Sequence, residues 1–435
     1  MTYDSPLARR HRRRNRLVFI GDYVFFGLGL TLASTTTTLP AFAATLTKSS
    51  VLIGAVSAVW TGGWLLPQVL AVPFLANRPR MYRVLMGAQI VSRPAFALFV
   101  GWLLLDGARH PQLTLGLFLL MLAYFAMADA VVALAWFDIF ARTTPPAERG
   151  RAVGASQLLM GVGAFGVGAL IERMLGPHGP GYPMNYVVIF GLAAICYLLS
   201  MATAALIVEP PENAAAGGPQ TLRGTLPHLL DVLRNDPAFA RLTVVRLLAG
   251  VGGLAIPFYV LHATEVLGLP PSTIGYFASA TTVGTAVAGL VLGTVADRLG
   301  IHRVVQVTAW VGFCVPVLAL LMPAASLRPA VAWLYPVLFA LLRLAEGSVV
   351  LGFLNYVLGI ARPGMRPAYM GLSNTLSGLL LLMPLIGGWL LERTSYPVVF
   401  GLTAAGTLAG ALAALRLPPT PTAPPEAAPV ETVVS

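Results

Sequence analysis

The feature that most constrains this chain is a series of apolar stretches, each long enough to cross a membrane. A helix needs about 20 apolar residues to span the roughly 30 Å of hydrocarbon in a bilayer. Such stretches lie at 17–46, 51–75, 84–105, 112–141, 152–175, 184–208, 239–262, 273–296, 304–322, 331–360, 367–391 and 397–415. Only 10% of the residues are charged and 57% are hydrophobic, which excludes a soluble globular protein. The sequence therefore predicts an all-α polytopic membrane protein with twelve transmembrane helices.

The distribution of positive charge predicts the orientation of the chain. The formal net charge is +11, which would suit a nucleic-acid-binding protein if the charges formed one patch. With the N-terminus placed inside, however, most of the 28 Lys and Arg residues fall on cytoplasmic segments, including RRHRRRNR at 9–16. This bias places both termini in the cytoplasm. We expect the basic head to be a topology anchor that also contacts anionic lipid, and we expect no nucleic-acid partner.

The sequence offers no motif for catalysis, metal binding or ATP hydrolysis. Cys196 and Cys314 lie far apart in predicted helices, and the six histidines are scattered without metal-ligand spacing. A P-loop is also missing. We therefore expect a protein that is not an enzyme and has no cofactor. The single Lys among the basic residues favours a GC-rich bacterial genome, and with it a bacterial inner membrane.

The second half of the chain repeats the first. Shifting residues 123–161 by 217 positions lays them over 340–378 without a gap, and the same shift lays Pro40 over Pro257. In this alignment Asp129 falls on Glu346 and Gln157 falls on Asn374. The identical pairs include Ala128/Ala345, Val132/Val349, Arg149/Arg366, Gly154/Gly371, Ser156/Ser373 and Gly161/Gly378. A repeat of this length predicts two pseudo-symmetric bundles of six helices each.

The repeat divides the chain into five predicted segments. A basic cytoplasmic N-terminus at 1–16 precedes the first bundle at 17–208, and the second bundle covers 239–417. The linker at 209–238 carries leucines at helical spacing, which predicts an amphipathic helix on the cytoplasmic face. The Pro-rich tail at 418–435 is predicted to be disordered.

Three short motifs resemble those of the major facilitator superfamily. GTVADRLGIHR, which contains Gly293, Asp297, Arg298, Gly300 and Arg303, is similar to the signature loop of that family, and PPAERGRAVG and PLIGG resemble further family patterns. The resemblance implies two bundles around a central cavity that opens alternately to each side. The loop between helices 2 and 3, which carries the better copy in most of the family, is degraded here because Asn77 replaces the acid. The helix 5 proline motif of drug antiporters is also missing from GVGAFGVG, so the subfamily stays open.

Five ionisable residues lie well inside predicted helices: Arg93, Asp129, Arg246, Arg343 and Glu346. If all faced lipid unpaired, the cost would be roughly 12–17 kcal/mol, comparable to the whole stability of a typical fold, about 5–15 kcal/mol. They must therefore pair or face a wet interior. Each is a candidate for the substrate or coupling site.

The roles of the two acids, Glu346 and Asp129, each have two interpretations. Arg343 and Glu346 are three residues apart, so they share a helix face and form either a substrate or coupling site or a structural pair. Asp129 has no basic neighbour on its own helix, and Arg93 lies at a matching depth on helix 3. If the two pair, Asp129 is structural, whereas an unpaired Asp129 would accept the coupling proton.

A second group of residues is predicted to form a cytoplasmic gate. Asp138 lies on the opposite helix face from Asp129, where it can meet Arg78, Arg83, Arg142 or Arg149, or can simply be solvated. By resemblance, Asp297 and Arg298 have a similar gating role. The full set of predicted gate residues is Asp297, Arg298, Gly293, Gly300, Arg303, Asn77, Arg78, Arg83, Asp138, Arg149 and Arg366.

Uncharged polar residues complete the predicted cavity. Thr36 and Thr37 belong to STTTT, just before Pro40, where the helix can break and free backbone groups. Trp64 and Gln68 are spaced to form one wall, and Gln157 and Asn374 are related by the repeat. The alternative is structural: Thr hydroxyls bond to their own helix, and polar residues join neighbouring helices.

The sequence as a whole predicts a monomeric secondary active transporter that moves a small molecule by alternating access. Proton coupling and efflux of a drug-like or metabolite substrate are the favoured form. The alternatives are a facilitative uniporter or uptake permease, and a membrane sensor or lipid-handling protein on the same scaffold.

Overall fold

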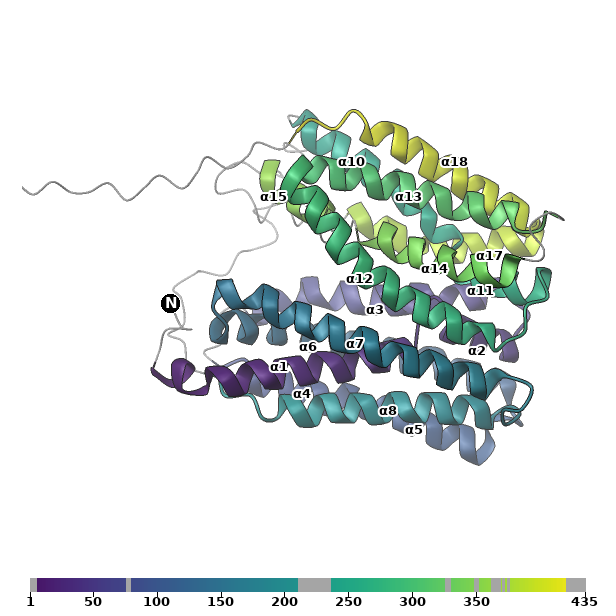
Figure 1. Ribbon diagram of the computed structural model, residues 1–435. Coiled ribbons are helices and arrows are strands. Elements are labelled where there is room, and N and C mark those ends of the chain that lie inside the picture. The colour runs from purple at the N-terminus through teal and green to yellow at the C-terminus, as the bar shows by residue number, and fades with distance from the viewer. Residues whose placement is uncertain are drawn as a thin grey trace, which may run out of the picture.

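The computed structural model describes residues 6–75, 80–209, 236–324, 330–347, 352–360, 369, 372–373 and 376–419. These residues form helices that run back and forth along one common direction (Figure 1). Ten stretches within them are long and apolar enough to cross a membrane. The expected spans 331–360 and 367–391 are not among the ten, and both include residues outside the described ranges. The protein is thus an all-helical, multi-pass membrane protein.

The helices form two groups. The first contains α1 (Pro6–Leu32), α2 (Thr38–Leu46), α3 (Ser50–Leu75), α4 (Tyr82–Ser92), α5 (Pro94–Trp102), α6 (Pro111–Thr143), α7 (Pro146–Leu175) and α8 (Met184–Ala204). The second contains α10 (Pro237–Gly250), α11 (Tyr259–Leu261), α12 (Thr273–Leu299), α13 (Ile301–Leu321), α14 (Val331–Glu346), α15 (Asn355–Ile360), α17 (Met383–Arg393) and α18 (Tyr396–Ala414). We call them the first half and the second half.

Two of the expected spans are interrupted, at places that the repeat relates. The stretch 17–46 is interrupted at 33–37 between α1 and α2, and the stretch 239–262 gives way after Gly250 to two short 3₁₀ turns. The prolines that the repeat aligns, Pro40 and Pro257, lie at these interruptions. A proline has no backbone N–H to donate, and the glycines around 250–253 weaken the helix further. Both halves therefore carry a broken helix at the same place.

The apolar core shows how the halves meet. One cluster of buried residues takes members from both halves, including Phe42 and Phe118 from the first and Tyr259 and Phe339 from the second. Toward the end of the molecule that carries the N-terminus, the halves have separate clusters: one around Phe19 in the first half, and two around Tyr356 and Leu292 in the second half. We call this end the basic end and the opposite one the distal end. The halves are joined through apolar packing at the distal end.

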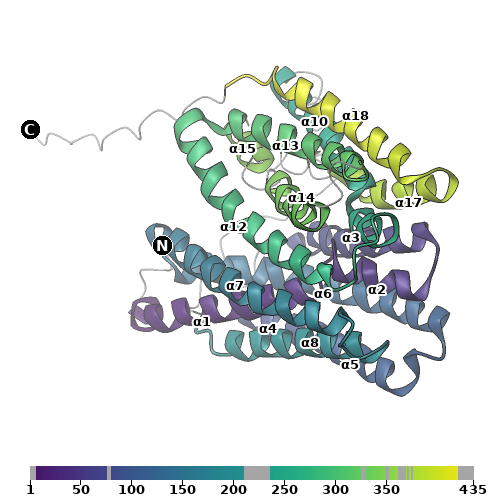
Figure 2. The same cartoon turned by 45° about the vertical axis from the view of Figure 1, so that its right-hand side comes forward.

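The helix contacts agree with this arrangement. α7 packs against α12, and α3 packs against α17, as the two principal contacts between the halves. α12 crosses α7 near the distal end and diverges from it toward the basic end (Figures 1 and 2). The space between the halves is consequently closed at the distal end.

Candidate functional site

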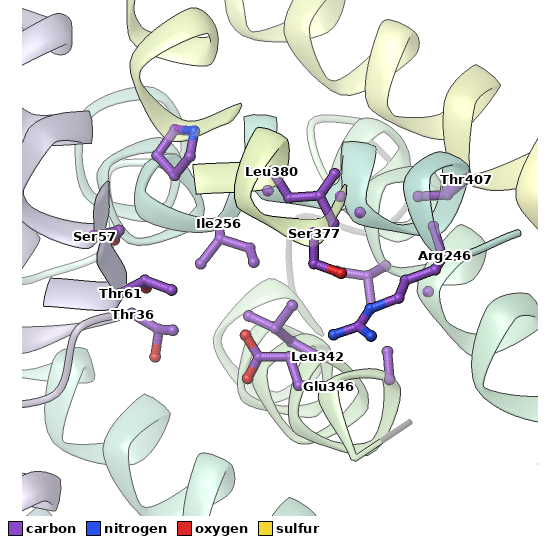
Figure 3. A pocket seen from close by; sticks show the side chains of 18 of the residues that line it. Thr36, Ser57, Thr61, Arg246, Ile256, Leu342, Glu346, Ser377, Leu380 and Thr407 are labelled. Carbon is purple, nitrogen blue, oxygen red and sulfur yellow. The ribbon is translucent and has the colours of Figure 1, made fainter. Parts of the chain in front are cut away.

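Two adjoining cavities lie between the halves. The first has a volume of about 330 Å³ and the second about 340 Å³, and Thr35 and Thr36 line both. In the first cavity the hydroxyl-bearing side chains of Thr36, Ser57 and Thr61 lie on one wall, with Arg246 and Glu346 on the other side (Figure 3). A cavity of this volume falls in the range of small-molecule sites. We take the two cavities together as the candidate substrate site.

The wall from the first half is built by the interruption at 33–37. The Oγ of Ser34 lies 3.1 Å from the Oγ1 of Thr36, and the Ser57 hydroxyl of α3 donates to the Thr35 carbonyl at 3.2 Å. The broken helix therefore presents hydroxyl and backbone groups at mid-depth without lipid contact, as irregular backbone in a membrane requires. Thr37 is fully buried, and it is not among the residues that line the cavities.

The wall from the second half carries the charges. Arg246 of α10 is half-buried and donates to the Ser373 hydroxyl at 2.5 Å, with its guanidinium 5.8 Å from the Phe353 ring centre. Arg343 and Glu346 of α14 form an ion pair at 2.6 Å, and the first lines one cavity while the second lines the other. The structure thus brings together Thr36, Arg246, Arg343 and Glu346 of the predicted site.

Several lining residues were missed by sequence reasoning. They are hydroxyl-bearing side chains spread over many helices: Ser57, Thr61, Thr281, Thr282, Thr285, Thr308, Ser377 and Thr407. A single Ser or Thr in an apolar helix gives no signal, because it can bond to its own backbone. Only the STTTT run stood out in the sequence.

Arg93 and Asp129 lie apart from the cavities. Arg93 Nη1 donates to Asp129 Oδ1 at 2.8 Å, both side chains are buried, and neither lines a cavity. The Arg93 guanidinium also lies 4.5 Å from the Phe26 ring centre, and Trp64 hydrogen-bonds to Asp129. Asp129 and Arg93 are thus paired, which is the condition that the first alternative for Asp129 requires.

Asp22 is a buried acid that sequence reasoning did not single out. Its carboxylate accepts hydrogen bonds from Ser200 Oγ at 2.5 Å and from Trp136 Nε1 at 2.6 Å. It was missed because the expected span began at 17 and so placed Asp22 near the membrane surface. The helix begins at Pro6, which places the residue well inside the bundle. Nothing in the sequence indicated that the helix begins eleven residues before the apolar stretch does.

The remaining predicted cavity residues are dispersed. Trp64 and Gln68 of α3 are half-buried outside the cavity walls. Gln157 of α7 faces Gly289 of α12 across the two halves. Asn374 lies outside the described residues.

The predicted gate residues of the first half form contacts within that half. Asp138 pairs with Arg142 at 2.6 Å, and Arg142 lies 3.6 Å from Glu209. Glu209 accepts from the backbone amides of Met81 and Tyr82, both at 2.8 Å, where a carboxylate favours the helix N-terminus. Arg149 instead bonds to the carbonyls of Ala141 and Thr144 at the end of α6. These contacts fix the ends of helices at the basic end.

The signature loop of the second half is open to solvent in part. Asp297 and Arg298 are exposed, and Arg303 donates to Gln306, which bonds to the Ala414 carbonyl of α18. Gly300 ends α12 with a φ of +88°, a conformation that favours glycine. Gly293 lies on α12 with open space beside it, and Arg83 is exposed. Asn77, Arg78 and Arg366 lie outside the described residues.

The distal end holds the two halves together by close contacts. A Cβ built on Gly54 of α3 would overlap the Pro384 carbonyl oxygen, and one built on Gly388 of α17 would overlap the Ser50 carbonyl oxygen. Glu392 accepts from the Ser49 hydroxyl at 2.6 Å and from the Val51 amide at 3.2 Å. The closure of this end thus combines close backbone contact with hydrogen bonds to carboxylates, since Glu172 of α7 also accepts from the Tyr276 hydroxyl of α12 at 2.5 Å.

Glu392 predicts a pH dependence of this closure. The Ser49 hydroxyl, followed by the Val51 amide, lowers the pKa of Glu392 below its ordinary value of 4.5. Because the closed state lowers this pKa, its contribution is complete above the ordinary value and is lost as the pH falls through the lowered value. We expect distal-side maleimide labelling of a cysteine at Thr61, expressed relative to labelling of the denatured protein at the same pH, to rise as the pH falls from 7 to about 4. Glu392→Gln should remove this rise, and an identical pH profile in the variant would contradict the assignment.

The chain matches a known family and known folds. A family model described as the Major Facilitator Superfamily matches residues 23–379 and 247–434. A D-xylose-proton symporter of known structure has a TM-score of 0.67 at 13% identity, covering 93% of this chain and 98% of its own. The nucleoside transporter NupG gives 0.61 at 14%, covering 95% and 99%. A bacterial homologue of the human lysosomal transporter Spinster, in an inward-facing and unoccupied conformation, gives 0.55 at 14%, covering 95% of each.

No curated protein sequence matches the chain. The structural likenesses lie at low identity and show the fold. The family match extends over nearly the whole length and includes both halves. The chain belongs to the Major Facilitator Superfamily.

Proposed function

We propose that the protein is a secondary active transporter that moves a small molecule across a bacterial inner membrane by alternating access. The observation that carries the proposal is the position of the two cavities between the halves, with the closing contacts at the distal end. Both halves line the cavities, so a rotation of one half against the other would change access to a bound molecule. The transport activity in the names of the structural neighbours, a nucleoside transporter and a D-xylose-proton symporter, agrees with this function.

The proposal includes the orientation and the state of the molecule. The basic end faces the cytoplasm, because the positive charges favour that side, and both termini lie there. The distal end is closed, so this conformation would admit the substrate from the cytoplasm. Release to the other side requires the contacts of Gly54, Gly388 and Glu392 to separate. Lipid surrounds a monomer in this arrangement.

Coupling to protons, if the transporter uses it, is assigned to Glu346. It is the carboxylate among the described residues that line the cavities, so it can exchange protons with solvent and respond to a substrate. Asp129 is assigned the structural role instead, because its carboxylate is paired with Arg93 away from the cavities. Uptake in proteoliposomes with an imposed pH gradient tests both assignments. The expected pattern, measured per correctly folded transporter, is coupled uptake retained in Asp129→Asn and lost in Glu346→Gln, and the reverse pattern would overturn it.

Alternating access is tested by thiol labelling. In a background with Cys196 and Cys314 replaced by serine, Thr61→Cys places a thiol in the cavity wall, because Thr61 lines the first cavity and is exposed there. A membrane-impermeant maleimide should label it rapidly from the basic side. Labelling from the distal side should be slower and should change when a transported solute is added. A thiol that reacts from one side only, under every solute in a broad screen, would rule out alternating access.

A further inference from the structure

The charges that line the two cavities do not cancel. Three of the described lining residues are charged at neutral pH: Arg246, Arg343 and Glu346. Arg343 and Glu346 neutralise each other at 2.6 Å. The first half contributes lining side chains that are uncharged, because its own buried pair of Arg93 and Asp129 lies elsewhere. One positive charge, that of Arg246, is left over.

Arg246 has room to bind a ligand. Its Nη1 donates to the neutral Ser373 hydroxyl, and no described acid lies within ion-pair distance of its guanidinium. A guanidinium has five N–H donors in a fork that matches a carboxylate or a similar anion. It lies roughly 14 Å along α10 from the helix start at the basic end. A charge at this depth is costly unless a counter-ion or a wet cavity compensates it.

The rest of the first cavity is mainly apolar. Around Arg246 it is lined by aliphatic and small side chains, including Ile256, Leu342 and Leu380 (Figure 3). A purely inorganic anion would leave this surface unused. A molecule with one anionic group and an apolar body would use both features.

We propose that the substrate is an amphipathic organic monoanion whose acidic group binds Arg246 and whose apolar body occupies the first cavity. This proposal rests on the proposed transport function, because the bound anion is a substrate only if the protein transports it. The binding itself requires only the cavity. Glu346 and Arg343 remain paired beside the ligand, so the charge of Arg343 is not available to bind a second anion.

The test compares three probes that share one body and differ in charge: phenylbutyrate, phenylbutylamine and phenylbutyramide. The readout is the protection of Thr61→Cys from a membrane-permeant maleimide in the purified full chain. Phenylbutyrate should protect the thiol, and the amine and the amide should not. Stronger protection by phenylbutylamine than by phenylbutyrate would overturn the proposal.

Substitutions locate the binding group. Arg246→Met should weaken protection by phenylbutyrate about 10–100-fold, the range of one hydrogen bond to a charged group, and Arg246→Lys should weaken it less. Arg241→Met is the matched control, because Arg241 lies on the same helix, is exposed and lines neither cavity. Equal loss in Arg241→Met and Arg246→Met would contradict a role for Arg246.

The sign of the Glu346 effect gives an independent check. Glu346→Gln removes the negative charge of the cavity and releases Arg343, so it should leave phenylbutyrate protection unchanged or strengthen it. If the cavity binds cations, the same variant should instead lose protection by phenylbutylamine.

The outcomes also separate this proposal from transport. Protection by the anion without two-sided labelling would reject transport alone, whereas two-sided labelling with protection by the amine alone would reject the anionic substrate alone.

Discussion

Gly388→Val and Gly54→Val should each open the distal end of the protein and stop transport. In both cases the added side chain would have to occupy the space of a backbone carbonyl in the other half, Ser50 for Gly388 and Pro384 for Gly54. A backbone atom held in a helix cannot move aside as a flexible side chain can. Overpacking of this kind costs typically 1–3 kcal/mol, and each 1.4 kcal/mol is a factor of ten. The ratio of molecules closed at the distal end to molecules open there should fall about 5–140-fold.

The expected defect is a change of conformation and not a loss of folding. Gly54 and Gly388 make their closest contacts across the interface between halves, so the strain disappears when the halves separate at this end. Gly387 provides the contrast, because its Cβ would meet the Leu254 carbonyl oxygen within the second half. Gly387→Val should therefore lower the unfolding temperature without favouring the open state. Substitution of two adjacent glycines should therefore have different effects: Gly388→Val changes the conformation, and Gly387→Val lowers the stability.

Thiol labelling distinguishes these outcomes. Maleimide labelling of Thr61→Cys from the distal side should become rapid in Gly54→Val and Gly388→Val, while the thermal unfolding midpoint in detergent changes little. Gly401→Val is the control, since a Cβ at Gly401 meets open space. Slow distal labelling in both interface variants, at an unchanged unfolding midpoint, would show that these contacts do not hold the end closed.

The fold was predictable from the sequence because it depends on features that recur along the chain. Apolar length predicted the helices, and the shift of 217 predicted two halves, because both depend on composition and spacing along one chain. The interruption near Pro40 was also predicted, since it follows from the missing N–H of a proline, whereas for Pro257 the sequence predicted only that it aligns with Pro40. The helix start at Pro6 was not predicted. The basic segment before residue 17 is too polar to count as part of a membrane span, although its arginines can continue a helix.

The site was predicted only in part, for a physical reason. A charge inside an apolar stretch is costly, so Arg246, Arg343 and Glu346 were visible in the sequence. Whether such a charge faces a cavity or another charge depends on packing between helices, which one sequence does not contain. The sequence allowed Arg93 to pair with Asp129 but left open whether Asp129 binds the coupling proton, and both residues lie away from the cavities. Ser57 and Thr407 carry no charge and were therefore missed.

The pair of Arg93 and Asp129 is expected to be the most sensitive element of the first half. Removing one partner of a buried ion pair leaves an uncompensated charge and costs about 3–5 kcal/mol. Arg93→Met should be the more severe change, because it leaves Asp129 without a counter-ion and also removes the electrostatic interaction of Arg93 with Asp22. Asp129→Asn should cost less, because Asp22 continues to compensate part of the Arg93 charge.

The double variant Arg93→Met/Asp129→Leu separates a structural pair from a coupling site. Replacing a whole buried pair by apolar residues of similar volume is often neutral or stabilising, so the unfolding midpoint should return toward that of the native protein. If the pair is structural, transport should return with it, measured as uptake in proteoliposomes with an imposed pH gradient. Restored stability without coupled uptake would instead give Asp129 a part in proton transfer. Wild-type stability in Arg93→Met alone would show that the charge of Asp129 is compensated by other groups. The two readouts therefore decide between the alternatives that the sequence left open, since stability reports the pair and coupled uptake reports the proton.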